Sequence, residues 1–348
     1  MKNIHTYETC DGSVQKRGVP ETNGKRLYAF DIAKGILILC LLFSHFGVAC
    51  GNTGIDICQS HFAWIYGFLP LLTKSYMQCF FFISGYCSNF DVNARTFLRK
   101  QLKGLVLPAV IFGSLLGLYN HFVFQWNLTI VTFWFLHALL FAKIICYFLY
   151  KYVSDYRINL LLTALLLLVA IAVNRYDIGS NVLSVNQCLA SCFFVMFGLV
   201  MKNLGGAKSV LLKYSWMVYV VFFLIVYVLH IQFSLPYITG VFEKYELYMF
   251  PLLVFIPFVS IFTLLRFCQM LGRCRWLEYL GRNSLVVYCL HMIPLVWLIK
   301  LTFQWFRPEN RFQGSLFMLF IIAIEVLVMF AVISIFNKKP LKYVLGKF

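Results

Sequence analysis

The sequence predicts an all-α protein, a polytopic membrane helix bundle of about ten transmembrane helices with both termini in the cytosol. Of its 348 residues, 61% are hydrophobic and only 12% are charged, and the mean hydropathy is +0.80. A soluble domain cannot bury that much apolar surface, whereas long apolar runs are typical of membrane spans. The basic residues cluster in short loops between these runs. The net charge of +17 therefore indicates orientation in a bilayer and not binding to nucleic acid.

Ten apolar segments approach the roughly 20 residues that a transmembrane helix needs. They are residues 29–49, 64–87, 104–124, 131–150, 158–174, 184–201, 212–232, 247–267, 284–303 and 314–336. The segment at 64–87 contains Pro70 and Lys74, so we expect it to begin as an interfacial or broken helix. The polar residues 1–24 are expected to form a disordered cytosolic tail that precedes a membrane domain at 25–348.

The distribution of Lys and Arg sets the predicted orientation. Twenty-two of the 30 basic residues fall in the two tails and in alternate loops, three lie within segments, and five lie on the opposite side. These five are Arg175, Lys244, Lys300, Arg307 and Arg311. Because loops rich in Lys and Arg stay in the cytosol, both termini are predicted to be cytosolic. An even number of spans agrees with this orientation.

The first segment, FDIAKGILILCLLFSHFGVA, carries a cation and an imidazole, Lys34 and His45. Their spacing corresponds to about 1100° of helix, roughly 20° past three full turns. Both side chains therefore lie on one face of one helix, about 16 Å apart along its axis. Ionisable groups in a membrane helix are costly and mark functional sites that face the bundle interior. The spacing suits a long molecule that is held at one end by a cation and reacts at the other end beside a base.

Further motifs are spread over the chain. They are DIAKGILILCLLFSH at 31–45, CFFFISGYC at 79–87, FWFLHALLFAKII at 133–145, LGRNSLVVYCLH at 280–291 and, more weakly, FFVMFG at 193–198. In this order they resemble the integral-membrane acyltransferase family (acyltransferase type 3), which includes sugar and polysaccharide O-acetyltransferases. The family has a basic residue, usually Arg, then ten residues, then His. Lys34 stands at the basic position, where it keeps the charge but lacks the planar fork of Arg.

The resemblance implies that His45 is the catalytic residue. Acyl transfer from a thioester to a hydroxyl needs a base, and neutral imidazole is the usual one. His45 would deprotonate the acceptor hydroxyl for direct attack on the thioester, although a covalent acyl-histidine intermediate is also open. An isolated histidine at this depth would otherwise be interpreted as a satisfied interfacial side chain. Lys34 would face the phosphates of coenzyme A, oriented by Asp31; its structural alternatives are snorkelling to the interface or pairing with Asp31.

The ninth segment carries a second group of candidates. Arg282, Asn283 and Ser284 open it at the cytosolic end, where they either cap the helix or bind coenzyme A phosphates. His291 lies about two turns further in, on an otherwise apolar helix. It is either a satisfied buried histidine or part of a pocket for the acceptor or the thioester.

Two further pairs have structural alternatives. Ser84 and Gly85 are small residues that favour close packing of helices, and no base adjoins Ser84 in sequence, so it is not expected to be a nucleophile. Trp134 and His137 lie near the outer end of the fourth segment. Trp134 either belongs to an aromatic belt at the membrane interface or stacks on a sugar ring in an acceptor site.

Lys143 and Glu325 lie deep in the fourth and tenth segments. An unpaired charge at such a depth costs at least about 2.5 kcal/mol on insertion scales. The two residues are therefore candidates either for a mutual ion pair or for lining a pocket.

The residues and the resemblance together predict a membrane-bound acyltransferase of the bacterial inner membrane. It would move an acyl group, acetyl from acetyl-CoA, to a hydroxyl of a sugar, a glycolipid or a surface polysaccharide. Acyl-CoA is expected as a co-substrate, with no permanently bound cofactor, and no CxxC spacing or Cys/His cluster indicates a metal. The alternatives are a catalytically inactive scaffold and a transporter or flippase for a glycolipid or polyol. The sequence shows no inverted repeat, which disfavours a transporter.

Overall fold

The computed structural model describes residues 28–53, 70–121, 133–175, 185–204, 250–339 and 341–345, with a few positions between 220 and 228. Within these ranges every regular element is a helix, which confirms the predicted all-α class. The elements are α1 (Tyr28–Asn52), α3 (Pro70–Tyr86), α4 (Ala94–Gln101), η2 (Leu102–Val106), α5 (Leu107–His121), α7 (Trp134–Tyr152), α8 (Tyr156–Arg175), α9 (Val185–Asn203), α12 (Phe250–Leu271), α13 (Arg275–Arg282), α14 (Ser284–Leu290), α15 (Met292–Phe303), α16 (Arg311–Phe336) and η4 (Leu341–Leu345).

Six of these helices are long and apolar enough to cross a membrane, or seven if the bent pair α14 and α15 forms one span. The six lie in α1, α7, α8, α9, α12 and α16. The protein is therefore a multi-pass membrane protein by helix length and composition, but the predicted number of about ten spans is not confirmed. The tail at 1–24 and all but a few positions of the predicted segment at 212–232 fall outside the described residues.

The predicted segment at 284–303 is a broken helix. Its two parts, α14 and α15, meet at His291 with a bend of 54°. Pro294 lies in the first turn of α15 and has no N–H to donate to the carbonyl of Leu290. The neighbouring bonds persist, from the His291 N–H to Val287 and from the Leu295 N–H to the His291 carbonyl. The proline explains the bend and leaves His291 at its corner.

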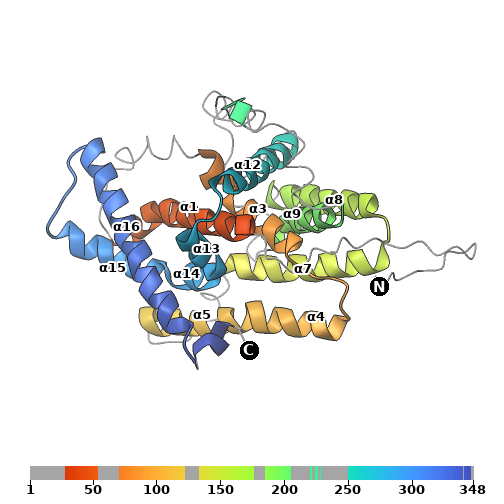
Figure 1. The fold of residues 1–348 in the computed structure, drawn as a ribbon, viewed down its shortest axis with the longest axis horizontal. Helices are drawn as coiled ribbons and strands as arrows, with labels where there is room; N and C mark the ends of the chain where they lie inside the picture. Colours follow the sequence, from red (N-terminus) through yellow and green to blue (C-terminus); the bar gives the residue numbers. More distant parts are fainter. Residues whose placement is uncertain are drawn as a thin grey trace, which may run out of the picture.

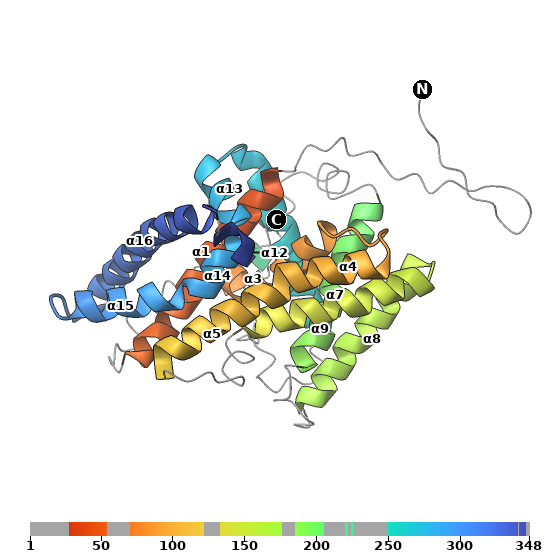
Figure 2. The same cartoon turned by 90° about the horizontal axis from the view of Figure 1, so that it is seen from below.

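The predicted segment at 104–124 is also longer than a simple span, because α4, η2 and α5 form one continuous rod. Asn93 caps its N-terminus by accepting a hydrogen bond of 2.8 Å from the Thr96 N–H. The rod passes through one π-helical turn directly before Pro108, which cannot donate to the carbonyl four residues earlier. In both views the rod runs beside α7 (Figures 1 and 2).

Helix α1 lies in the middle of the molecule and packs on α13, and α3 packs on α9 (Figure 1). Glycines allow both approaches. A Cβ added at Gly281 would overlap the backbone carbonyl oxygen of Asp31, and one at Gly35 would overlap that of Leu277. A Cβ at Gly85 would likewise overlap the backbone of Val195 on α9. These close approaches fix the end of the bundle where α13 reaches the first turns of α1.

The outer helices α8 and α16 lie at opposite ends of the bundle (Figures 1 and 2). Each presents large exposed apolar side chains, such as Leu161 and Leu165 on α8 and Phe320 and Leu327 on α16. In a multi-pass membrane protein such faces contact lipid. The interior that they enclose is formed mainly by α1, α3, α7, α9 and α14, and the candidate site lies among these helices.

Candidate active site

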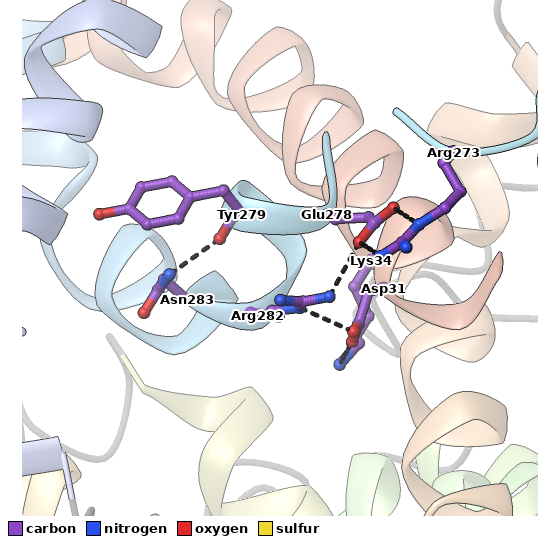
Figure 3. A network of polar contacts seen from close by, with 7 residues as sticks. All are labelled: Asp31, Lys34, Arg273, Glu278, Tyr279, Arg282 and Asn283. Carbon is purple, nitrogen blue, oxygen red and sulfur yellow. Dashed lines mark hydrogen bonds and ion pairs between the residues drawn. The ribbon is translucent and has the colours of Figure 1, made fainter. Parts of the chain in front are cut away.

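A cluster of five charged side chains joins α1 to α13 and to the loop before it (Figure 3). We call Asp31, Lys34, Arg273, Glu278 and Arg282 the ion cluster. Asp31 accepts from Lys34 Nζ at 2.9 Å and, through its other oxygen, from Arg282 Nε at 3.1 Å. Glu278 accepts from Arg282 Nη2 at 2.8 Å and from Arg273 Nε at 3.3 Å. Arg282 thus bridges the two carboxylates.

The two carboxylates of the ion cluster are the buried members. The side chains of Asp31 and Glu278 are 3% and 4% exposed, whereas that of Arg273 is 71% exposed. Buried carboxylates need such partners, because an isolated buried charge is very costly. The hydrogen bonds that Arg273 donates to the Glu278 carboxylate raise the pKa of Arg273 above its ordinary value, so this side chain stays charged. Three cations face two carboxylates, which leaves one net positive charge at the N-terminal end of α1.

A cavity of about 230 Å³ begins beside the ion cluster. Lys34 and Ile38 of α1, Ser84 of α3, and Ser284 and Tyr288 of α14 are among the side chains that line it. Most of the remaining lining is apolar and comes from α3, η2 and α7. The cavity therefore has a charged or polar rim on the α1 and α14 side and apolar walls, a combination typical of small-molecule sites.

Two histidines lie together beyond the cavity. The rings of His45 on α1 and His291 at the α14–α15 bend meet edge to face, with their centroids 5.0 Å apart. His45 is seven residues beyond Ile38 on the same helix face, and His291 is three residues beyond Tyr288. The cavity-lining faces of α1 and α14 therefore both lead to these two residues. We call His45 and His291 the histidine pair.

Hydrogen bonds set the orientation of both rings. Nδ1 of His45 lies 3.0 Å from the carbonyl oxygen of Leu41, and Nδ1 of His291 lies 3.0 Å from that of Tyr288. A carbonyl oxygen only accepts, so in the neutral rings the proton resides on Nδ1 and the Nε2 lone pair is left available. Nε2 of His291 is buried and has no hydrogen-bond partner among the residues that the structure describes. The pair can therefore accept protons or hydrogen bonds from a bound molecule.

Ser44 and Tyr76 complete the surroundings of His45. Ser44 Oγ lies 3.2 Å from His45 Nδ1 and 3.3 Å from the hydroxyl of Tyr76. These contacts connect α1 to α3 beside the imidazole. No pattern in the sequence points to Tyr76, whereas Glu278 could have been found from its position four residues before Arg282.

Of the other residues predicted for the donor site, one lines the cavity and two are engaged by neighbouring groups. Ser284 lines the cavity. Asn283 precedes α14 at the cap position, but its side chain makes no capping bond there. Its amide instead donates to the Tyr279 carbonyl at 2.8 Å (Figure 3). Arg282 is held by both carboxylates of the ion cluster, as described above.

Trp134 and His137 lie in the first turn of α7 and are half-buried. They do not line the cavity, which is bordered instead by their neighbours Phe135 and Leu136. The Phe135 ring lies 5.3 Å from the ring of Tyr288, so this end of α7 approaches α14 close to the histidine pair. Trp134 contacts Phe135 edge to face at 6.2 Å.

The structure does not pair Lys143 with Glu325. Glu325 is fully buried on α16, and neither carboxylate oxygen has a hydrogen bond within the described part of the chain. Lys143 lies half-buried on α7, a helix that packs against α3, α8, α9 and η2. Of the two alternatives for these residues, the mutual ion pair is therefore absent.

One of three comparisons with known proteins identifies a family for this chain. The family model of an acyltransferase domain matches residues 27–335. No curated protein and no solved structure gives a significant match to the chain. The family match spans α1 to the end of α16 and so includes the ion cluster, the cavity and the histidine pair. Because it covers most of the sequence, the chain belongs to the acyltransferase type 3 family of integral-membrane acyltransferases.

Proposed function

We propose that this membrane acyltransferase transfers an acetyl group from acetyl-CoA to a hydroxyl of a sugar, a glycolipid or a surface polysaccharide. The observation that carries the proposal is the position of His45. Its Nδ1 is tied to the Leu41 carbonyl, its Nε2 is left to act as a base, and the cavity leads from Lys34 toward it. A bacterial inner membrane as the location is part of the same proposal.

In the proposed reaction, Nε2 of His45 takes the proton of the acceptor hydroxyl as its oxygen attacks the thioester carbonyl. The new ester C–O bond forms, and the C–S bond of acetyl-CoA breaks when the tetrahedral intermediate collapses. The imidazolium returns its proton to the coenzyme A sulfur, which leaves as the thiol. Histidine is regenerated and no further reactant is needed. His291, Trp134 and His137 are proposed to contact the acceptor.

The donor is proposed to enter from the cytosolic end of the bundle. Its phosphates would meet the net positive charge of the ion cluster near Lys34, Arg282 and Ser284. The apolar walls of the cavity suit the extended thioester arm of coenzyme A, which would reach toward the histidine pair about 16 Å from Lys34 along α1. The apolar walls lower the local dielectric constant, which strengthens the electrostatic contacts at both ends.

Purified protein incubated with labelled acetyl-CoA and a panel of sugars, glycolipids and polysaccharides tests this function. We expect transfer of label by the wild type and a loss of at least about 100-fold in His45→Gln, because a required general base contributes at least that much. Lys300→Gln, at an exposed position of α15, is the control and should keep full activity. If His45→Gln kept more than about a tenth of the activity, the proposed base would be wrong. Uptake of a glycolipid or polyol into proteoliposomes without acyl transfer would support the transporter alternative instead.

A further inference from the structure

Lys143 is a charged side chain that the ion cluster and the histidine pair leave unexplained. It is half-buried, and it makes no ion pair or hydrogen bond with any residue that the structure describes. It lies nine residues before the end of α7 at Tyr152, about 13 Å along the helix axis. That is farther than a four-carbon stem can snorkel toward the end of the helix.

The side chain of Lys143 belongs to the face of α7 that borders the cavity. Leu136 and Leu139 line the cavity, and Lys143 follows them by seven and four residues, one turn nearer the cytosol. Cys87, at the end of α3, also lines the cavity. Lys34 lines the same cavity from α1. Two lysines on different helices therefore flank the cytosolic mouth of the cavity.

Lys143 differs from the other cations near the cavity in its unused hydrogen-bonding capacity, because Lys34 is paired with Asp31 at 2.9 Å. Nε and Nη2 of Arg282 are already engaged by Asp31 and Glu278. Lys202 of α9 is also engaged, because it donates to the Ser88 carbonyl at 2.8 Å. Lys143 has its full hydrogen-bonding capacity available, in a half-buried position where an uncompensated ammonium is costly. A bound anion would remove that cost.

We propose that Lys143 and Lys34 bind the diphosphate of the acyl-CoA donor from opposite walls of the cavity mouth. This inference rests on the proposed function and moves the centre of the phosphate site from α13 toward α3 and α7. A diphosphate suits two separate ammonium groups, because lysine binds phosphate as a point charge and does not need a planar partner. The arm of the donor would then continue past Ser84 and Ser284 into the cavity.

Binding of labelled coenzyme A to the purified protein in zwitterionic nanodiscs tests the site. Lys143→Met keeps the length of the side chain and removes its charge, and we expect it to weaken binding by about tenfold or more. Lys143→Arg should bind within about threefold of the wild type, since it keeps the charge. The matched control is Lys151→Met, two turns further along the same helix and on the surface, which should bind as the wild type does.

A second measurement separates loss of the diphosphate contact from misfolding. S-acetylpantetheine lacks the diphosphate, so Lys143→Met and the wild type should use it as a donor at equal rates. Inorganic diphosphate should displace coenzyme A from the wild type. Equal coenzyme A binding by Lys143→Met and Lys151→Met would overturn the inference and leave the proposed function standing. Loss of binding to a polyprenyl diphosphate, with coenzyme A binding intact, would also overturn it by assigning Lys143 to a lipid-linked acceptor. Failure of the wild type to bind coenzyme A at all would refute the donor of the proposed function, and the inference with it.

Discussion

The ion pairs of Asp31 determine whether Lys34 can be substituted without leaving a buried charge unpaired. Its two oxygens receive different cations, Lys34 on Oδ1 and Arg282 on Oδ2, and the carboxylate is buried. Removing Lys34 therefore leaves Asp31 still paired with Arg282, so a substitution at Lys34 does not expose a bare buried charge. The role of Lys34 toward a donor can for this reason be tested separately from its contribution to folding.

We expect Lys34→Ala to raise the KM for acetyl-CoA by about tenfold or more, equivalent to about 1.4 kcal/mol of lost binding. The KM for the acceptor should change less, because Lys34 lies three turns from His45 along α1. Lys34→Arg should keep activity, since it keeps the charge. Steady-state kinetics with each substrate varied, together with direct measurement of donor binding, would show this. A change confined to the acceptor KM, or equal inactivity of the two variants, would leave the ion pair with Asp31 as the only role of Lys34.

At the scale of single residues, the sequence predicts contacts within one helix better than contacts between helices. The pairing of Lys34 with Asp31, one of two structural alternatives, follows from a spacing of three residues. The second partner of Asp31, Arg282, is 251 residues away, and no periodicity connects the two. The contact between His45 and His291 likewise depends on how α1 meets the bend after α14. Such contacts are set by packing and not by local pattern.

At the scale of elements, glycines determine which helices can touch. Gly281 of α13 lies against the Asp31 backbone of α1, and this contact brings Arg282 within reach of the Asp31 carboxylate. Apolar periodicity predicts α1, and it predicts α14 and α15 as one segment at 284–303, but it does not predict the short helix α13. It also misses the break at His291, which Pro294 explains once the neighbouring turns are seen. The low helix propensity of proline could have indicated this break from the sequence alone.

We expect Gly281→Ala to destabilise the protein by about 1–3 kcal/mol or more, because the added methyl would overlap the Asp31 carbonyl and separate α13 from α1. Thermal unfolding in detergent, followed by the loss of helical circular dichroism, measures this effect. Gly51→Ala is the matched control, since a Cβ at Gly51 on α1 meets nothing within 4 Å. The control should be neutral or slightly stabilising, as expected for alanine in a helix. Equal melting of the two variants would show that the α1–α13 contact is not tight.

At the scale of the whole molecule, the membrane class follows directly from composition, but the cavity does not. Its lining comes from α1, α3, η2, α7 and α14, and most of these side chains are ordinary apolar residues in the sequence. Only Lys34, Ser84 and Ser284 belong to the residues singled out beforehand. The cavity depends on the relative placement of five elements, and a pattern read along one helix contains no information on that placement.

The orientation in the membrane is the remaining prediction for the whole molecule, and it decides which compartment supplies the donor. The 22-to-5 division of basic residues places the ion cluster on the cytosolic side and the end of α1 beyond His45 on the other. Acyl-CoA is made in the cytosol, so this orientation would bring the donor to Lys34 first. Single cysteines can be introduced at Gly51 and at Lys338, which are both exposed, in a background without the 12 native cysteines. In sealed right-side-out vesicles, a membrane-impermeant maleimide should label position 51, whereas position 338 should need inside-out vesicles. Labelling of both positions from the same side would refute the orientation, and the donor would then have to reach the cavity from another direction.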